Sequence, residues 1–161
     1  MHKKEGVSMH IRISARAIVI HDGHILLNRF CDGVTENYYT VGGGMEPGES
    51  ACEAVVRETY EESGLHVVAK QHLCTFEYEP TRLDCRWGKV HTMSLYFLCE
   101  LVGSAEITAP SIPDSEHSHA VWVPLAELPT LPFGPAVIFP SLLRFVQTGV
   151  FTPSYIEDRP N

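Results

Sequence analysis

One segment, residues 43–65, holds charged residues and glycines at fixed intervals and constrains the fold more than any other part of the chain. It reads GGMEPGESACEAVVRETYEESGL. Ser50 followed by Glu53 is a capping box, which predicts a helix that begins directly after Ser50. Gly64 suits the left-handed conformation in which helices commonly end. The segment therefore predicts a glycine turn that leads into one helix, and the helix ends at Gly64.

Three glutamates near the end of this helix share one side of it. At about 100° per residue, Glu61, Glu58 and Glu62 lie at roughly −60°, 0° and +40° around the helix axis. Two carboxylates about 6 Å apart repel by on the order of 3 kcal/mol at an effective dielectric of about 20. A bound divalent cation would remove this cost, so the pattern predicts a metal site. The competing interpretation is a solvated acidic face, which is the commoner reason for acidic residues on a helix.

The spacing of the whole segment resembles the signature of the Nudix hydrolases, G-x5-E-x7-R-E-U-x-E-E-x-G-U, in which U is a bulky apolar residue. Every charged and glycine position of the signature matches. Thr59 stands where an aliphatic residue is more usual, and Val41 stands where a proline often precedes the glycines. We expect the first departure to affect packing rather than chemistry. The matched positions are Gly43, Glu49, Arg57, Glu58, Glu61, Glu62, Gly64 and Leu65.

The resemblance implies a fold, a reaction and a cofactor. The fold is an α/β (α+β) Nudix-like α/β/α sandwich with a mixed β-sheet. The reaction is hydrolysis of a nucleoside diphosphate linked to another moiety, by attack of water at phosphorus. The cofactor is Mg²⁺, with Mn²⁺ as an alternative, and carboxylates with one backbone carbonyl are suitable ligands for it. The implied metal ligands are the Gly42 carbonyl and the carboxylates of Glu58, Glu61 and Glu62.

The resemblance does not identify the general base. Within the segment, Glu58 or Glu62 could deprotonate the water, and Glu116 on a later loop, near Asp114, is a further candidate. A Nudix domain that binds nucleotides without cleaving them is the non-enzymatic alternative, but such domains usually lose one of the glutamates and none is lost here. We expect Glu49 to pair with Arg57 and hold the glycine loop against the helix. The expected catalytic set is Glu49, Arg57, Glu58, Glu61, Glu62 and Glu116.

Substrate contacts are expected from several elements. Arg29 ends a predicted strand where related enzymes often place a cation, and Arg16 shares a strand face with Arg12 and Ser14. Gly43 and Gly44 allow close backbone approach. Phe30, Tyr39 and Phe76 are candidates for stacking on a base.

Pro80 lies 15 residues after Leu65, counted as 80 − 65, which is typical of the branch that cleaves ADP-ribose. ADP-ribose or a nucleotide sugar is therefore the favoured substrate. A nucleoside triphosphate pyrophosphatase that removes damaged nucleotides is the alternative.

Composition restricts the class of protein. The 161 residues fit one domain, and a formal charge of −8 without a basic stripe argues against a nucleic-acid partner. Five scattered cysteines indicate reduced thiols. We find no signal peptide and no apolar stretch long enough to span a membrane, so we expect a cytoplasmic protein without a membrane partner. The small-molecule substrate is the expected partner, and a homodimer is plausible from the family.

The rest of the chain predicts mixed strands and helices around this segment. The expected domain covers residues 9–150, after a disordered lead-in at 1–8 and before a C-terminal tail at 151–161 that trails off. An Asp-Gly hairpin signal joins the first two strands. The expected elements are strands from residue 11 to 20, 25 to 30, 38 to 41, 66 to 79, 90 to 102 and 119 to 125, and helices over 51–63 and 140–148.

Overall fold

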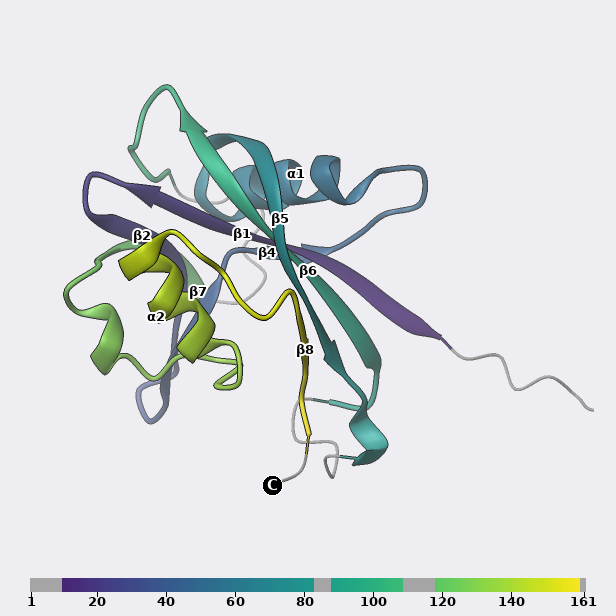
Figure 1. Cartoon of the computed structure of the whole chain (residues 1–161). Coiled ribbons are helices and arrows are strands. Elements are labelled where there is room, and N and C mark those ends of the chain that lie inside the picture. The colour runs from purple at the N-terminus through teal and green to yellow at the C-terminus, as the bar shows by residue number, and fades with distance from the viewer. Residues whose placement is uncertain (1–9, 83–87, 109–117, 160–161) are drawn as a thin grey trace, which may run out of the picture.

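The computed structural model describes residues 10–82, 88–108 and 118–159. The strands in these residues form one mixed sheet. Within these residues the strand order is β3-β2-β1-β6-β5-β8, with β4 also paired to β1 and β7 to β2 (Figure 1). The strands are β1 (Ile11–His21), β2 (His24–Cys31), β3 (Glu36–Thr40), β4 (Gly42–Gly44), β5 (His66–Tyr78), β6 (His91–Val102), β7 (Ser118–Pro124) and β8 (Tyr155–Glu157); the helices are α1 (Ala51–Ser63), α2 (Phe139–Thr148) and the short 3₁₀ turns η1 (Pro80–Arg82) and η2 (Leu128–Thr130).

Strand β1 connects the two halves of the sheet. It runs parallel to β6 along most of its length, and β6 pairs antiparallel with β5. At its far end β1 turns back into β2 through Asp22 and Gly23, whose φ angles are 45° and 73°. Positive φ at both central residues is typical of the tight hairpin that the Asp-Gly pair predicts. The expected hairpin is therefore present.

The two faces of the sheet are covered by different helices. One buried cluster contains Ala17 of β1 and Val55 of α1, and the other contains Ile18 of β1 and Leu142 of α2. Successive residues of β1 thus face opposite sides, as strand geometry requires. Figure 1 shows α1 on one side of the long strands and α2 on the other. The predicted α/β/α arrangement with a mixed sheet is confirmed.

Helix α1 begins and ends where the sequence predicts. The Ser50 side chain accepts the Glu53 N–H at 3.2 Å, and the Glu53 carboxylate accepts the Ser50 N–H at 2.8 Å, which completes the capping box. Gly64 ends the helix at φ 71°. Thr59 is fully buried and its hydroxyl donates to the Val55 carbonyl at 2.6 Å, so the polar substitution is satisfied within the helix. Neither α1 nor any other helix among the described residues has the length and apolarity of a membrane span.

The predicted C-terminal tail at 151–161 is wrong in its central part. Residues 155–157 form β8, which runs parallel to β5 from Thr75↔Tyr155 to Glu77↔Glu157. Ile156 is 6% exposed and belongs to the core on the α2 side. Without β8 the unpaired groups of β5 would leave an open sheet edge. A strand of three residues is too short to show the alternation of apolar and polar residues that marks longer strands, so the sequence pattern does not reveal it. The lead-in at 1–8 lies outside the described residues.

Candidate active site

Strand β4 brings the glycines against helix α1. It pairs with β1 through Ala15↔Gly43 and Arg16↔Gly42. Gly42 has a φ of 130°, and a Cβ there would overlap the Ala15 carbonyl. A Cβ on Gly43 would lie 2.5 Å from the Glu58 carboxylate. Only glycine allows both approaches, because any other residue would place a Cβ against these atoms. The glycines of β4 therefore let a carboxylate of the helix pack directly against the strand backbone.

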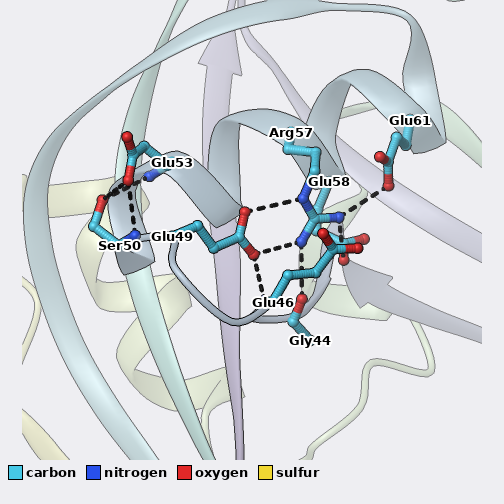
Figure 2. A network of polar contacts seen from close by, with 8 residues as sticks. All are labelled: Gly44, Glu46, Glu49, Ser50, Glu53, Arg57, Glu58 and Glu61. Carbon is cyan, nitrogen blue, oxygen red and sulfur yellow. Dashed lines mark hydrogen bonds and ion pairs between the residues drawn. The ribbon is translucent and has the colours of Figure 1, made fainter.

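Arg57 of α1 holds the loop that follows β4. Its Nε and Nη2 donate to the two Glu49 oxygens at 3.1 and 2.7 Å, and Nη2 also donates to the Gly44 carbonyl at 3.0 Å (Figure 2). Glu49 in addition accepts the Glu46 N–H at 2.6 Å. The Arg57 side chain, and then this N–H, hold the pKa of Glu49 below its usual range. The predicted pairing of Glu49 with Arg57 is present and has the two-pronged geometry of strong arginine–carboxylate pairs.

Arg57 also contacts two of the glutamates expected to bind metal. Its Nη1 lies 2.9 Å from Glu58 Oε1 and 3.0 Å from Glu61 Oε2 (Figure 2). The pKa of Arg57 is raised, mainly by its hydrogen bond to Glu49 and further by Glu58, although burial opposes the rise. Figure 2 shows the guanidinium in the middle of these carboxylates. One arginine therefore offsets part of a negative charge contributed by three glutamates.

Glu62 contacts a different set of groups from Glu58 and Glu61. Its Oε2 accepts the Gly42 N–H at 2.7 Å. Burial raises the pKa of Glu62 to about 7, although the Gly42 N–H, the Arg16 charge and a hydrogen bond with Asn28 all act to lower it. A positive charge beside a buried carboxylate favours its ionised form. The neighbouring groups thus offset only part of the cost of burying the Glu62 charge.

The Gly42 carbonyl, an expected metal ligand, accepts a hydrogen bond from Arg16. Arg16 Nη1 lies 2.6 Å from this oxygen and 3.3 Å from the Thr40 carbonyl. A carbonyl oxygen carries two lone pairs, so one remains for another ligand. Arg16 is therefore engaged in fixing the strand that supplies the carbonyl.

The donor set fits a divalent cation, but the side chains are not gathered around one point. Carboxylates together with a carbonyl are the oxygen ligands that Mg²⁺-type ions prefer. Among the residues that the structure describes, no three or more His, Cys, Asp or Glu side chains converge to hold an ion. Arg57 draws Glu58 and Glu61 toward itself, while Gly42 holds Glu62. The Glu61 side chain is 50% exposed, so it has room to turn toward a cation.

A cavity of about 340 Å³ lies on the other side of β4, where the α2 face of the sheet begins. Arg12, Ser14 and Arg16 project into it from β1, as their shared strand face predicts. Its volume is at the lower end of small-molecule sites. The lining combines two arginines, hydroxyls and aromatic rings: Arg12, Ser14, Arg16, Asn28, Tyr39, Thr40, Phe76, Tyr78, Thr92, Ser94, Tyr96, Ser118, Gly134 and Pro135.

Some predicted substrate contacts lie in this cavity and others do not. Tyr39 and Phe76 line it, whereas Phe30 does not. Arg29 is also absent from the lining, and its Nε instead donates to Glu36 Oε1 at 2.6 Å. Asn28 faces the cavity, so its neighbour Arg29 points to the opposite side of the strand.

The candidate bases on the later loop, Glu116 and Asp114, lie outside the described residues. The described chain resumes at Ser118, which lines the cavity.

Sequence reasoning missed the polar residues that β6 contributes to the cavity. Ser94 lies opposite Ser14 in the parallel register, and their hydroxyl oxygens are 2.8 Å apart in a buried position. Thr92 and Ser94 are polar residues two positions apart in a mostly apolar strand, and this alternation is a usable signal for a polar cavity wall. Which strand they face depends on long-range pairing, and a single sequence does not show it.

Comparison with known proteins gives a family and several relatives. A family model described as the NUDIX domain matches residues 10–142. The NAD-capped RNA hydrolase NudC of Pseudomonas entomophila is 34% identical over 128 residues, which cover 78% of this chain and 42% of that protein. An NAD-capped RNA hydrolase of Schizosaccharomyces pombe is 55% identical over 51 residues, or 31% of this chain and 14% of that protein. The chain thus matches less than half the length of these relatives.

Solved structures show the same fold at low sequence identity. A NUDIX hydrolase from Nitrosomonas europaea has a TM-score of 0.68 at 17% identity and covers 89% of this chain and 93% of its own. An ADP-ribose pyrophosphatase from Streptococcus suis has a TM-score of 0.62 at 21% identity, and the match covers 91% of this chain and 98% of that one. These likenesses support the fold alone.

Proposed function

The chain belongs to the Nudix family of hydrolases, and from that premise we propose that it is a Mg²⁺-dependent pyrophosphohydrolase. Its substrate would be a nucleoside diphosphate linked to another moiety, with ADP-ribose or a nucleotide sugar favoured. Nudix hydrolases generally use divalent metal ions. The choice of Mg²⁺ is supported by the oxygen-only donor set of Glu58, Glu61, Glu62 and the Gly42 carbonyl.

The observation that carries the proposal is the arrangement on the two sides of β4. The Glu58 carboxylate sits against Gly43 on the α1 side, and the cavity with Arg12 and Arg16 opens on the other side. Cations held by carboxylates neutralise a diphosphate and polarise its phosphoryl oxygens. The cavity would seat the organic moiety while the diphosphate lies at the carboxylates.

In the proposed reaction, a water oxygen bonds to one phosphorus atom as the bond from that phosphorus to the bridging oxygen breaks. The bridging oxygen leaves with the other phosphate, and the proton lost by the water passes to a carboxylate. Glu58, Glu62 and Glu116 are the candidates for this base. Arg57 has a positioning role, because it holds the Glu49 loop and the Gly44 carbonyl in place beside the glutamates.

The favoured substrate class rests on the cavity and on the relatives. A cavity of about 340 Å³ suits one nucleoside-sized moiety, and the moiety on the other side of the diphosphate would then lie outside it. The curated relatives are named NAD-capped RNA hydrolases. The formal charge of −8 disfavours long contacts with an RNA backbone. A small dinucleotide-like substrate therefore has priority over RNA.

A substrate panel with Mg²⁺ tests the proposal. ADP-ribose, UDP-glucose, NAD⁺, an NAD-capped RNA and nucleoside triphosphates would be compared by chromatography of the products. AMP released from ADP-ribose, and lost on chelation of the metal, supports the proposal. Pyrophosphate released from triphosphates supports the alternative of a nucleotide-sanitising enzyme. Nucleotide binding without turnover of any compound would indicate a non-catalytic domain and overturn the proposal.

A second measurement addresses the base. Glu116→Gln should lower kcat by about a hundredfold if Glu116 removes the proton, since general base catalysis contributes about 10²–10⁴-fold. Asp114→Asn is the matched control, because it removes the same charge two residues away. Equal activity of both variants and the wild type would leave Glu58 and Glu62 as the candidates.

A further inference from the structure

Two arginines line the cavity, and they differ in their contacts with the residues that the structure describes. Arg16 donates to the carbonyls of Gly42 and Thr40. Arg12 has neither a hydrogen-bond nor an ion-pair partner in the part of the chain that the structure describes. Its side chain is on the exposed part of β1, where the cavity meets solvent. The described part of the cavity wall therefore presents one guanidinium, that of Arg12, without a protein partner.

The position of Arg12 relates it directly to the carboxylate site. Its Nη2 and Nε would lie 3.4 and 3.5 Å from a Cβ placed on Gly44. The preceding glycine, Gly43, faces the Glu58 carboxylate instead. Neighbouring strand residues face opposite sides, and their Cα atoms are about 3.8 Å apart. Only the thickness of β4 thus separates the cation of Arg12 from the carboxylates on which a metal ion would sit.

The charge of the cavity explains what such an arginine would bind. Neither aspartate nor glutamate belongs to the described lining, although the whole chain carries a formal charge of −8. A guanidinium matches the oxygens of a phosphate with two parallel hydrogen bonds. A diphosphate bound at the edge of β4 would place one phosphate at the carboxylates and direct the other toward Arg12, which lies beside Gly44.

We propose that Arg12 is a phosphate-binding residue that holds the phosphate on the cavity side of the scissile diphosphate. This inference rests on the proposed function for the identity of the substrate as a diphosphate. Arg12 would bind the non-bridging oxygens of the phosphate attached to the moiety in the cavity, while the α1 carboxylates and their cation hold the other phosphate. Its role is ground-state binding and positioning, and no proton transfer is assigned to it.

The direct test is the affinity for methylenediphosphonate, a non-hydrolysable diphosphate, measured by calorimetry with Mg²⁺ present. Arg12→Gln should weaken binding by about tenfold or more, because hydrogen bonds to charged groups are the stronger ones. Arg12→Lys should recover part of the loss, since it keeps the charge without the fork. Arg159→Gln is the matched control: it removes the same charge from an exposed arginine that is paired with Glu157 outside the cavity. It should change the affinity less than about twofold.

Kinetics give the second readout. On any substrate that the wild type cleaves, Arg12→Gln should raise KM by about tenfold and leave kcat within about threefold, because the contact exists before the chemical step. Unchanged thermal unfolding of the variant would confirm that the loss is local.

Equal affinities of Arg12→Gln, Arg159→Gln and the wild type for methylenediphosphonate would overturn the assignment and leave Arg12 as a solvated surface residue. A wild type that binds the diphosphonate but cleaves no substrate would contradict the proposed function, and the comparison of the two arginine variants would still decide the role of Arg12.

Discussion

The two sides of the glycine strand β4 differ in how their charges are satisfied. On the α1 side, Arg57 is fully engaged, with hydrogen bonds to Glu49, Glu58, Glu61 and the Gly44 carbonyl. On the cavity side, Arg12 has no such partner in the described chain. Among the described residues, the first side has more acidic than basic side chains, and the second has arginines without aspartate or glutamate. A ligand that carries both bound cations and negative phosphates would complement the two sides together.

The two helices that flank the sheet show a related difference. Helix α1 has a complete capping box at Ser50, and its C-cap Gly64 lies against Thr108. Helix α2 has no side-chain cap at its start, and a Cβ added to its C-cap Gly149 would meet nothing within 4 Å among the described residues. The helix that carries the glutamates is therefore fixed at both ends, which would suit the precise placement that the proposed function asks of them.

The largest expected effect is on the acidic side of β4. Glu61→Gln removes one charge from the proposed ligand set and should lower turnover by at least about a hundredfold, because even outer-shell changes at metal sites cost about 10–100-fold. The measurement is kcat on the best substrate of the panel, together with the Mg²⁺ concentration that gives half-maximal rate.

Glu53→Gln is the control for this change on the same helix. Glu53 belongs to the capping box, which a glutamine also satisfies, so its activity should stay near the wild-type value. Wild-type turnover of Glu61→Gln would exclude Glu61 as a ligand and would remove much of the charge difference between the two sides.

The second effect compares the two helix ends. Gly64→Ala and Gly149→Ala both place a Cβ at a left-handed φ, 71° and 73°, which costs about 1–2 kcal/mol in each case. At Gly64 the new methyl group would also collide with the Thr108 side chain. Overpacking of this kind adds about 1–3 kcal/mol. Urea unfolding should therefore show the larger loss for Gly64→Ala, and equal losses would mean that the Thr108 contact has no energetic weight.

The sequence predicted the acidic side of β4 far better than the cavity side. Its contacts lie within one short segment: Glu49 and Arg57 are eight residues apart, the cap of Ser50 by Glu53 spans three, and the contact of the Gly42 N–H with Glu62 spans 20. A short spacing between two residues on a helix can be interpreted from the sequence, because helix geometry fixes which residues are neighbours on the helix surface.

The cavity is assembled from distant strands, so its residues depend on pairing that spacing does not encode. Ser14 and Ser94 meet across 80 residues. The place of Arg29 at a strand end predicts a substrate contact. Arg29 follows Asn28 directly in the strand, so its side chain points to the other face of the sheet and away from the cavity that Asn28 lines. The final strand β8 was missed for the same reason, because the unpaired edge of β5 exists only in the folded sheet.

The third effect concerns competition between Arg57 and a cation for the same carboxylates. Arg57→Gln should lower the free energy of unfolding by about 1–2 kcal/mol, a modest loss because the Arg57 side chain is 25% exposed. Added MgCl₂ should raise the Tm of the variant more than that of the wild type, since Glu58 and Glu61, two of the proposed ligands, would no longer contact Arg57. Arg29→Gln, which breaks an exposed pair, should shift stability by less than about 0.5 kcal/mol. An equal response of Arg57→Gln and wild type to MgCl₂ would show that the arginine does not restrain these glutamates.

The smallest effect lies on the cavity side, in the buried hydroxyl pair of Ser14 and Ser94. Their oxygens are 2.8 Å apart, and the residues are 1% and 6% exposed. Ser94→Ala leaves the Ser14 hydroxyl without this partner and should cost about 1 kcal/mol in urea unfolding. The double variant with Ser14→Ala should cost less than the sum of the two single variants, because it leaves neither hydroxyl unpaired. Strictly additive losses would indicate that each hydroxyl is satisfied by solvent in the cavity, and that the cavity wall is wetter and less fixed than the carboxylate side of β4.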